Sequence, residues 1–138
     1  MKIEIANLIE DLSLDEEALR KLLSEVLQQE GKKQARLSVA LVDDKTIATL
    51  NQRYLGRRGA TDVLAFPFNL GPGGKDLGEI VISVETARSV ARSRKKSIQK
   101  EIFLYALHGL LHLLGYDHNT TSEAREMRKK EIEALARL

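Results

Sequence analysis

Three short stretches in which polar and apolar residues alternate, and one short apolar run, predict β-strands in four parts of the chain. The period of two is clearest over residues 2–6 and 36–42, where apolar side chains recur at every second position. Residues 63–66 and 78–83 are rich in apolar and β-branched side chains and have the length of strands. Because such strands turn one face to a core, we expect the four segments to join in one sheet.

Apolar residues recur at helical spacing in five further segments, each preceded by a residue suited to cap a helix. The expected N-caps are Ser13, Asp43 or Asp44, Ser83, Ser97 and Thr120. Gly31 and Gly115 are expected to end the first and fourth helices. The fourth helix contains IFLYALHGLLHLLG and is apolar on nearly all sides, so it belongs in the centre of a core. The inward residues expected in the last helix are Ala124, Met127, Ile132 and Leu135.

The order of these elements, β-α-β-α-β-β-α-α-α, predicts an α+β fold. We expect a small mixed β-sheet of about four strands packed with about five helices, with the apolar, histidine-bearing helix at the centre. A chain of 138 residues has the length of a single domain, so one domain is predicted over residues 1–138. The Gly- and Pro-rich segment 69–77 is interpreted as a loop within that domain.

Composition narrows the class of protein. Hydrophobic residues make up 43% and charged residues 30% of the chain, which is typical of a folded globular protein and excludes a disordered one. The absence of cysteine excludes disulfides, thiol nucleophiles and cysteine-bound metals. The longest apolar stretch, 102–116, is too short to cross a bilayer, and the acidic N-terminus does not fit a secretory signal. We therefore expect a cytoplasmic protein without a membrane partner. Its oligomeric state is not predicted.

All three histidines of the chain fall in one run, HGLLHLLGYDH. His108 and His112 are four residues apart on a predicted helix, so their imidazoles share a face and can reach one metal ion. A left-handed turn at Gly115 would bring His118 back across the helix end as a third ligand. A single histidine in an apolar helix is usually a core or surface residue, but this spacing favours one divalent metal ion. Zinc is the expected ion, although imidazole also suits copper, nickel and iron.

The same run matches the zinc signature H-E-x-x-H-x-x-G-x-x-H except that Gly109 stands in the place of the glutamate. In the peptidases that carry this signature, the glutamate is the general base, so its absence disfavours peptide hydrolysis. Three neutral imidazoles would leave a fourth position open, where bound water can become hydroxide near neutral pH. Asp117 can orient a ligand imidazole or move a proton, and equally can bond its own backbone in a turn.

Basic residues supply candidates for contact with phosphate. Arg57 and Arg58 lie in a Gly-flanked loop, and their guanidinium groups suit a phosphate that gains charge in a transition state. A second basic stretch, 88–100, can follow a nucleic-acid backbone. Either group alone is more typical of a solvated surface. With three Phe, three Tyr and no Trp, base stacking is poorly provided for, so we expect any RNA contact to be made mainly through the backbone.

The histidine run, together with LNQRYLGRRGATDVLAFPF and LGEIVIS upstream, resembles the YbeY family of metal-dependent endoribonucleases over residues 50–118. The resemblance implies a zinc-type ion held by His108, His112 and His118, and single-strand-specific cleavage of RNA. It also implies ribosomal RNA precursors as substrates and ribosomal particles as partners, in the maturation of ribosomal RNA.

The chain departs from the family at one position. Where the family has an arginine between Tyr and Gly, this chain has Leu55, so the guanidinium assigned to the substrate is missing there. Arg53, Arg57 or Arg58 could supply one from a neighbouring position. Three functions stay open: an endoribonuclease of ribosomal RNA processing, a non-catalytic ribosome-assembly factor with a structural metal, and another kind of zinc hydrolase.

Overall fold

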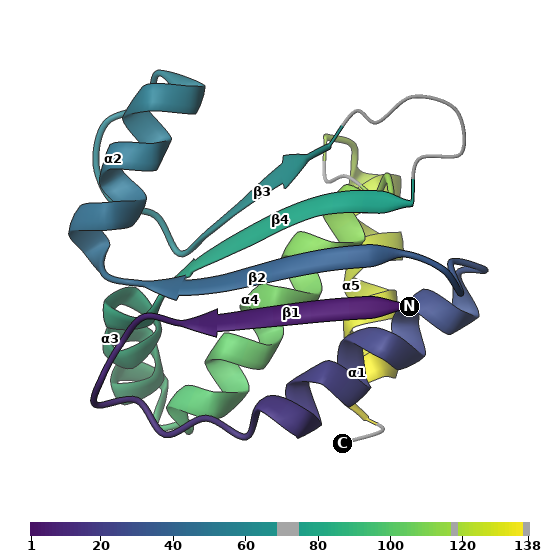
Figure 1. Cartoon of the computed structure of the whole chain (residues 1–138), viewed down its shortest axis with the longest axis horizontal. Coiled ribbons are helices and arrows are strands. Elements are labelled where there is room, and N and C mark those ends of the chain that lie inside the picture. Colours follow the sequence, from purple (N-terminus) through teal and green to yellow (C-terminus); the bar gives the residue numbers. More distant parts are fainter. Residues whose placement is uncertain (69–74, 117–118, 137–138) are drawn as a thin grey trace.

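The computed structural model describes residues 1–68, 75–116 and 119–136, which form four strands and five helices (Figure 1). The strands are β1 (Lys2–Asn7), β2 (Arg36–Val42), β3 (Val63–Pro67) and β4 (Asp76–Ser83). The helices are α1 (Glu16–Gln29), α2 (Asp44–Leu55), α3 (Val84–Arg94), α4 (Ile98–Leu113) and α5 (Thr121–Leu135). The predicted α+β fold, with its small mixed sheet, is confirmed.

The strands form one sheet in the order β1-β2-β4-β3. β1, β2 and β4 run parallel, whereas β3 pairs antiparallel with β4 and lies at the edge (Figure 1). α1 joins β1 to β2 and supplies the crossover that parallel neighbours require. α4 crosses behind the sheet in the view of Figure 1 and contacts both β3 and β4. The edge strand and the central helix therefore lie next to each other.

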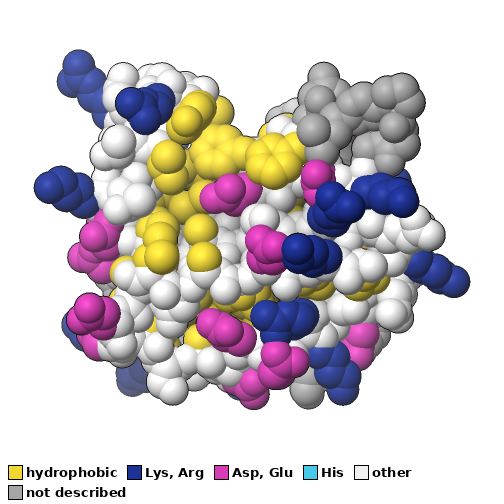
Figure 2. Space-filling model, in the orientation of Figure 1, with side chains coloured by type: hydrophobic (Ala, Val, Ile, Leu, Met, Phe, Trp, Pro, Cys, Tyr) yellow, Lys and Arg dark blue, Asp and Glu magenta, His cyan; other side chains and the backbone are white. Residues whose placement is uncertain are grey.

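The two faces of the sheet are covered to different extents. Successive side chains on a strand point to opposite faces. Leu41 and Ile80 belong to the main hydrophobic cluster, which includes residues of α1, α3, α4 and α5. Their neighbours Val42 and Val81 belong to a second, smaller cluster that includes Ile47 of α2. α2 covers one end of this second face. The remainder carries exposed polar and charged side chains, together with hydrophobic ones next to α2 (Figure 2).

Helix α4 lies at the centre of the main cluster, as its apolar sequence predicts. It contacts α1, α3, α5, β3 and β4, and most of its side chains are buried. Gly109 lets the helix approach the sheet closely, since a Cβ atom at this position would lie 2.8 Å from Cγ2 of Ile80. Gly109 therefore has a packing role. None of the helices in the described part of the chain is long and apolar enough to cross a membrane.

Replacing Gly109 with alanine is expected to lower the free energy of unfolding by up to about 2 kcal/mol. Overpacking a core costs about 1–3 kcal/mol, against about 1 kcal/mol that alanine gains over glycine in helix propensity. Urea unfolding measures the change. Because the clash is with Ile80, the double variant Gly109→Ala/Ile80→Ala should lose less stability than the sum of the two single variants. Additive losses would show that the contact between α4 and β4 is not the cause.

Four of the predicted helix caps are confirmed, and one is wrong. The side chains of Asp43, Ser83, Ser97 and Thr120 each accept a hydrogen bond from the backbone N–H three residues on. α1 is capped by Asp15 instead of Ser13, and Asp15 accepts from the N–H of Ala18. The N–H of Asp15 also donates to the side chain of Gln99 at 2.9 Å. This contact with α4 fixes the start of α1 at a place that local sequence does not reveal.

Helix α5 buries a narrower face than predicted. Met127 and Ala134 are buried and Leu135 packs against the main cluster, but Ile132 is 57% exposed. Glu131 takes the inward place instead, with a side chain only 16% exposed. The prediction for Ile132 is wrong. Residues four apart lie on the same face of a helix, so the buried face that contains Met127 continues at Glu131 and not at Ile132.

The first residues of β4 correct a loop boundary. Asp76 and Leu77 were predicted to lie in the Gly- and Pro-rich loop, but both belong to β4. Asp76 pairs with Arg36 of β2, and the register shifts at the next residue of β2, which is typical of a bulge. Residues 69–74 of the predicted loop lie outside the described residues.

Candidate functional site

The candidate site begins with two histidines on consecutive turns of α4. The side chain of His108 is 38% exposed, and His112 is exposed one turn later. The helix ends in the left-handed turn predicted at Gly115, whose φ is 99°. The N–H of Gly115 donates to the carbonyl of His112 at 3.1 Å, and that of Tyr116 to Leu111 at 3.0 Å. These two bonds form a Schellman motif that turns the chain back at the helix end.

The chain beyond this turn is tied to α1. The hydroxyl of Tyr116 donates a hydrogen bond to the carboxylate of Glu30, the C-cap residue of α1. This hydrogen bond, aided by burial, raises the pKa of Tyr116 to about 12, so the phenol stays protonated at neutral pH. The position of residue 116 is therefore fixed. The predicted site residues Asp117 and His118 follow it and lie outside the described residues.

A carboxylate from α5 approaches the first histidine. Oε2 of Glu131 lies 3.5 Å from Nδ1 of His108. The hydrogen bond to Glu131 raises the pKa of His108, against burial, which lowers it. Carboxylates hold metal-binding imidazoles in this way, since they fix the orientation of the ring and increase its basicity. Glu131 was not predicted as a site residue, although its place four residues after the inward-facing Met127 indicates that it also points inward.

The donor atoms present suit a zinc-type ion. Among residues 1–68, 75–116 and 119–136, no group of three or more His, Asp or Glu side chains is placed to hold a metal. The predicted third ligand, His118, is not among these residues. The two described histidines fit the expected site, because four-residue spacing puts both rings on one helix face and Glu131 orients one of them.

A cavity of about 420 Å³ opens beside His108. Its walls come from the start of β3 and from α3, α4 and α5, which are far apart in the sequence. The polar residues that line it are Thr61, Asp62, Thr86, Arg94, Tyr105, His108 and Glu131. The start of the edge strand β3 therefore borders a polar cavity that is also lined by His108, the first predicted metal ligand.

An arginine at the end of α3 reaches this cavity and is held by a buried carboxylate. Glu101 is 1% exposed, and its Oε1 lies 3.8 Å from Nη1 of Arg94. Its second oxygen, Oε2, has no hydrogen-bond partner in the described part of the chain. A carboxylate this deeply buried is costly unless a cation compensates it, so Glu101 favours keeping Arg94 at the cavity wall. Arg94 was predicted only as one of the basic residues of the stretch 88–100, and Glu101 was not predicted as part of the site.

Tyr105 lies beside the same pair. Burial, followed by the negative charges of Glu101 and Asp62, raises the pKa of Tyr105 to about 12. Its hydroxyl is therefore a neutral hydrogen-bond donor at the cavity wall throughout the physiological pH range. The cavity combines a guanidinium, a phenol and an imidazole, which together suit an anionic substrate such as a phosphodiester.

Residues 4–138 match a family model described as endoribonuclease YbeY. The chain belongs to the YbeY family. Among curated relatives, endoribonuclease YbeY of Pelotomaculum thermopropionicum is 42% identical over 149 aligned positions, which cover 100% of this chain and 97% of that protein.

Two further YbeY relatives are longer than this chain. Endoribonuclease YbeY of Anaeromyxobacter sp. strain Fw109-5 is 47% identical over 108 residues, which are 78% of this chain and 56% of that protein. Endoribonuclease YbeY of Anaeromyxobacter dehalogenans is 48% identical over 108 residues, which are 78% of this chain and 55% of that protein. The chain therefore spans about half the length of these two relatives. A Thermotoga maritima protein solved in solution has a TM-score of 0.66 at 27% identity, covering 98% of this chain and 90% of that one.

The two arginines predicted for substrate contact in this YbeY chain lie after α2. Arg57 and Arg58 are exposed in the connection to β3 and do not line the described cavity. Gly56 ends α2 with a φ of 64°, and the side chain of Asn51 donates to the carbonyl of Gly59 at 3.1 Å. The buried Asn51 thus shapes the loop that carries both arginines. Their catalytic role stays a prediction.

Proposed function

We propose that this chain is a metal-dependent, single-strand-specific endoribonuclease that acts in ribosomal RNA processing in the cytoplasm. One hydrolase domain spans residues 1–138, and ribosomal RNA precursors and ribosomal particles are its partners. The observation that carries the proposal is the position of His108. In a chain of the YbeY family, this histidine lies on a polar cavity and is oriented by Glu131.

His108, His112 and His118 would hold one divalent ion, with zinc as the expected metal. When bound, the ion would supply Lewis acidity and activate water near neutral pH. Glu131 positions the imidazole of His108 from the side of Nδ1. Asp117 precedes the third ligand and would orient it or carry a proton.

Arg94 would bind the scissile phosphate. It is the arginine that lines the cavity beside His108, and a guanidinium can donate two parallel hydrogen bonds to phosphate oxygens. Glu101 positions it through their ion pair, and Tyr105 would donate a further hydrogen bond from its neutral hydroxyl. Arg94 thus offers a replacement for the guanidinium that Leu55 does not provide. Arg57 and Arg58 would contact the RNA before it enters the cavity.

The proposal predicts zinc-dependent cleavage inside a single-stranded RNA. The full chain, saturated with Zn²⁺, is incubated with an end-labelled ribosomal RNA precursor fragment and with the same sequence annealed to its complement. We expect internal cleavage of the single strand, much slower cleavage of the duplex, and loss of both with a chelator. His118→Ala is the matched variant and should be inactive.

Two other outcomes would contradict the proposal. Cleavage that persists in the chelator and in His118→Ala would show that the metal is not needed. A zinc-loaded chain that associates with ribosomal particles but cleaves no RNA would be an assembly factor with a structural metal. Peptide turnover is not expected, since Gly109 packs against Ile80 and leaves no general base at its position.

A further inference from the structure

An exposed apolar surface lies on the face of the sheet opposite α4. We call it the aromatic platform, and it consists of Tyr54, Leu55, Phe66 and Phe68. Tyr54, Leu55 and Phe68 are 61%, 47% and 45% exposed. The rings of Tyr54 and Phe66 meet edge to face with centroids 5.6 Å apart. Figure 2 shows hydrophobic side chains lining a hollow next to α2 on this face. Three of the six aromatic residues of the chain gather here.

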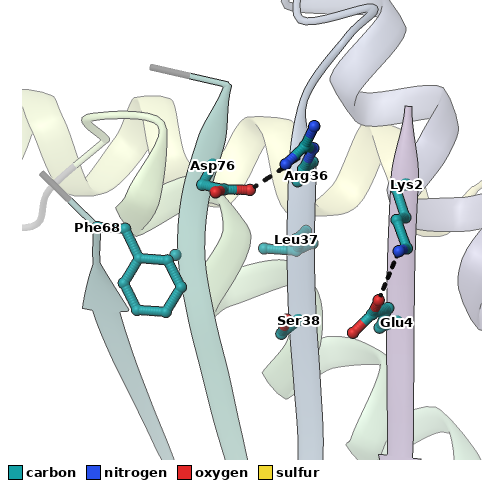
Figure 3. A pocket seen from close by; sticks show the side chains of 8 residues that line it. Lys2, Glu4, Arg36, Leu37, Ser38, Phe68 and Asp76 are labelled. Atoms are coloured by element: carbon teal, nitrogen blue, oxygen red, sulfur yellow. Dashed lines mark ion pairs between the residues drawn. The ribbon is translucent and has the colours of Figure 1, made fainter. Parts of the chain in front are cut away.

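Phe68 extends the platform toward the open half of the sheet. Its ring lies next to β4 and lines a pocket of about 260 Å³, which is also lined by one ion pair between β2 and β4 and a second on β1 (Figure 3). Arg36 and Asp76 are 4.0 Å apart, and Lys2 and Glu4 are 3.0 Å apart. Because these four charges compensate each other, this side of the platform attracts neither anions nor cations strongly.

The other side of the platform is positively charged. Arg53 belongs to the last turn of α2, and Arg57 and Arg58 follow in the adjoining loop. All three are exposed, and none forms an ion pair with another described residue. Unpaired guanidinium groups next to exposed rings are the combination that binds single-stranded nucleic acid, since the rings stack on bases and the cations follow the backbone.

One acidic residue sets the orientation of such a strand. Glu79 of β4 is paired in register with Phe66 and makes no ion pair in the described part of the chain. Its carboxylate repels phosphate but can accept hydrogen bonds from the amino groups of bases. A bound RNA strand would therefore turn its bases toward β4 and its phosphates toward the arginines. A duplex could not bind in this way, because its base faces are stacked inside.

We propose that the aromatic platform binds the single-stranded RNA substrate next to the cleavage site, by stacking bases on Tyr54 and Phe68. This inference rests on the proposed function and extends its substrate recognition. β3 connects the two places, since Phe66 lies near its end and its first residue, Val63, lines the cavity that contains His108. No described histidine is visible on the platform's face (Figure 2), so the RNA strand would cross the outer edge of β3 between platform and cavity.

The test compares two fluorescein-labelled strands of equal length and charge, one with bases and one abasic, without added metal. Fluorescence anisotropy gives the affinity of the full chain for each. We expect Tyr54→Ala and Phe68→Ala each to weaken binding of the base-bearing strand roughly 10-fold, and to leave the abasic strand unaffected. Tyr54→Phe keeps the ring and should bind as the parent does. Ile132→Ala removes a comparably exposed apolar side chain from α5 and is the matched control.

Replacing Arg57 and Arg58 with glutamine should weaken binding of both strands alike and reduce the salt dependence. Equal losses for both strands in the Tyr54 and Phe68 variants, or no loss in either, would overturn the proposal. Unchanged RNA affinity combined with lost binding to ribosomal protein would make the platform a protein-docking surface and overturn it too. These affinities are measured without catalysis, so a chain that binds as expected but never cleaves would refute only the proposed function.

Discussion

Replacing His112 with alanine is expected to abolish zinc binding and to reduce RNA cleavage about 1000-fold or more, since the ion contributes several kcal/mol to catalysis. His112 is exposed, so the variant should be as stable as the parent when both are free of metal. Zinc should raise the melting temperature of the parent, because binding to the native state alone stabilises it, and should leave the variant unchanged. Cleavage rates and thermal unfolding with and without Zn²⁺ measure both effects.

A milder variant, at Glu131, distinguishes loss of the metal ion from loss of the group that orients its ligand His108. Glu131→Gln keeps the shape of the side chain but removes its charge, and it should weaken zinc affinity about 10- to 100-fold, as loss of such supporting groups typically does. At saturating zinc its cleavage rate should largely recover, whereas that of His112→Ala should not. If zinc raises the melting temperature of His112→Ala as much as that of the parent, His112 is not a ligand.

Replacing Arg94 with alanine is expected to lower kcat/KM for RNA about 100- to 1000-fold, the usual cost of removing one preorganised donor to a developing negative charge. Arg94→Lys should recover part of the rate, because a single ammonium cannot form the bidentate contact. Arg92→Ala is the matched control, since Arg92 lies in the same last turn of α3 but does not line the cavity. It should be nearly fully active.

The ion pair with Glu101 requires a second variant. Arg94→Ala alone leaves a buried carboxylate without its cation, which destabilises the fold independently of catalysis. Arg94→Ala/Glu101→Gln should therefore recover stability, measured by urea unfolding, but not activity. A double variant with parental kcat/KM would show that Arg94 acts only on the fold.

Local patterns in the sequence predicted most of the fold correctly. Capping side chains such as Ser97 and Thr120 act within four residues, so their helices begin where the sequence indicates. Ser13 failed as a cap because Asp15 lies closer to the first turn and is held by Gln99 of α4. The position of β3 at the sheet edge was not predicted, since strand order depends on contacts between distant segments.

For the candidate site too, the features that depend on neighbouring residues were predicted, and those that depend on contacts between distant segments were not. The spacing of His108 and His112 is visible in the sequence because both lie on one helix. Glu131 of α5 and Arg94 of α3 reach one cavity only because both helices pack against α4, which also carries Glu101, the ion-pair partner of Arg94. The aromatic platform was not predicted, because the low total number of aromatic residues indicated little base stacking. In the folded chain, three of these residues gather on one surface.

The most direct test of the central claim is the zinc content of the chain, purified without an affinity tag or added metal and then titrated with Zn²⁺ in a calorimeter. We predict one bound ion per chain in the parent and none in His108→Ala, His112→Ala or His118→Ala. A parent chain that binds no divalent ion would contradict the account, and so would three histidine variants that each retain one.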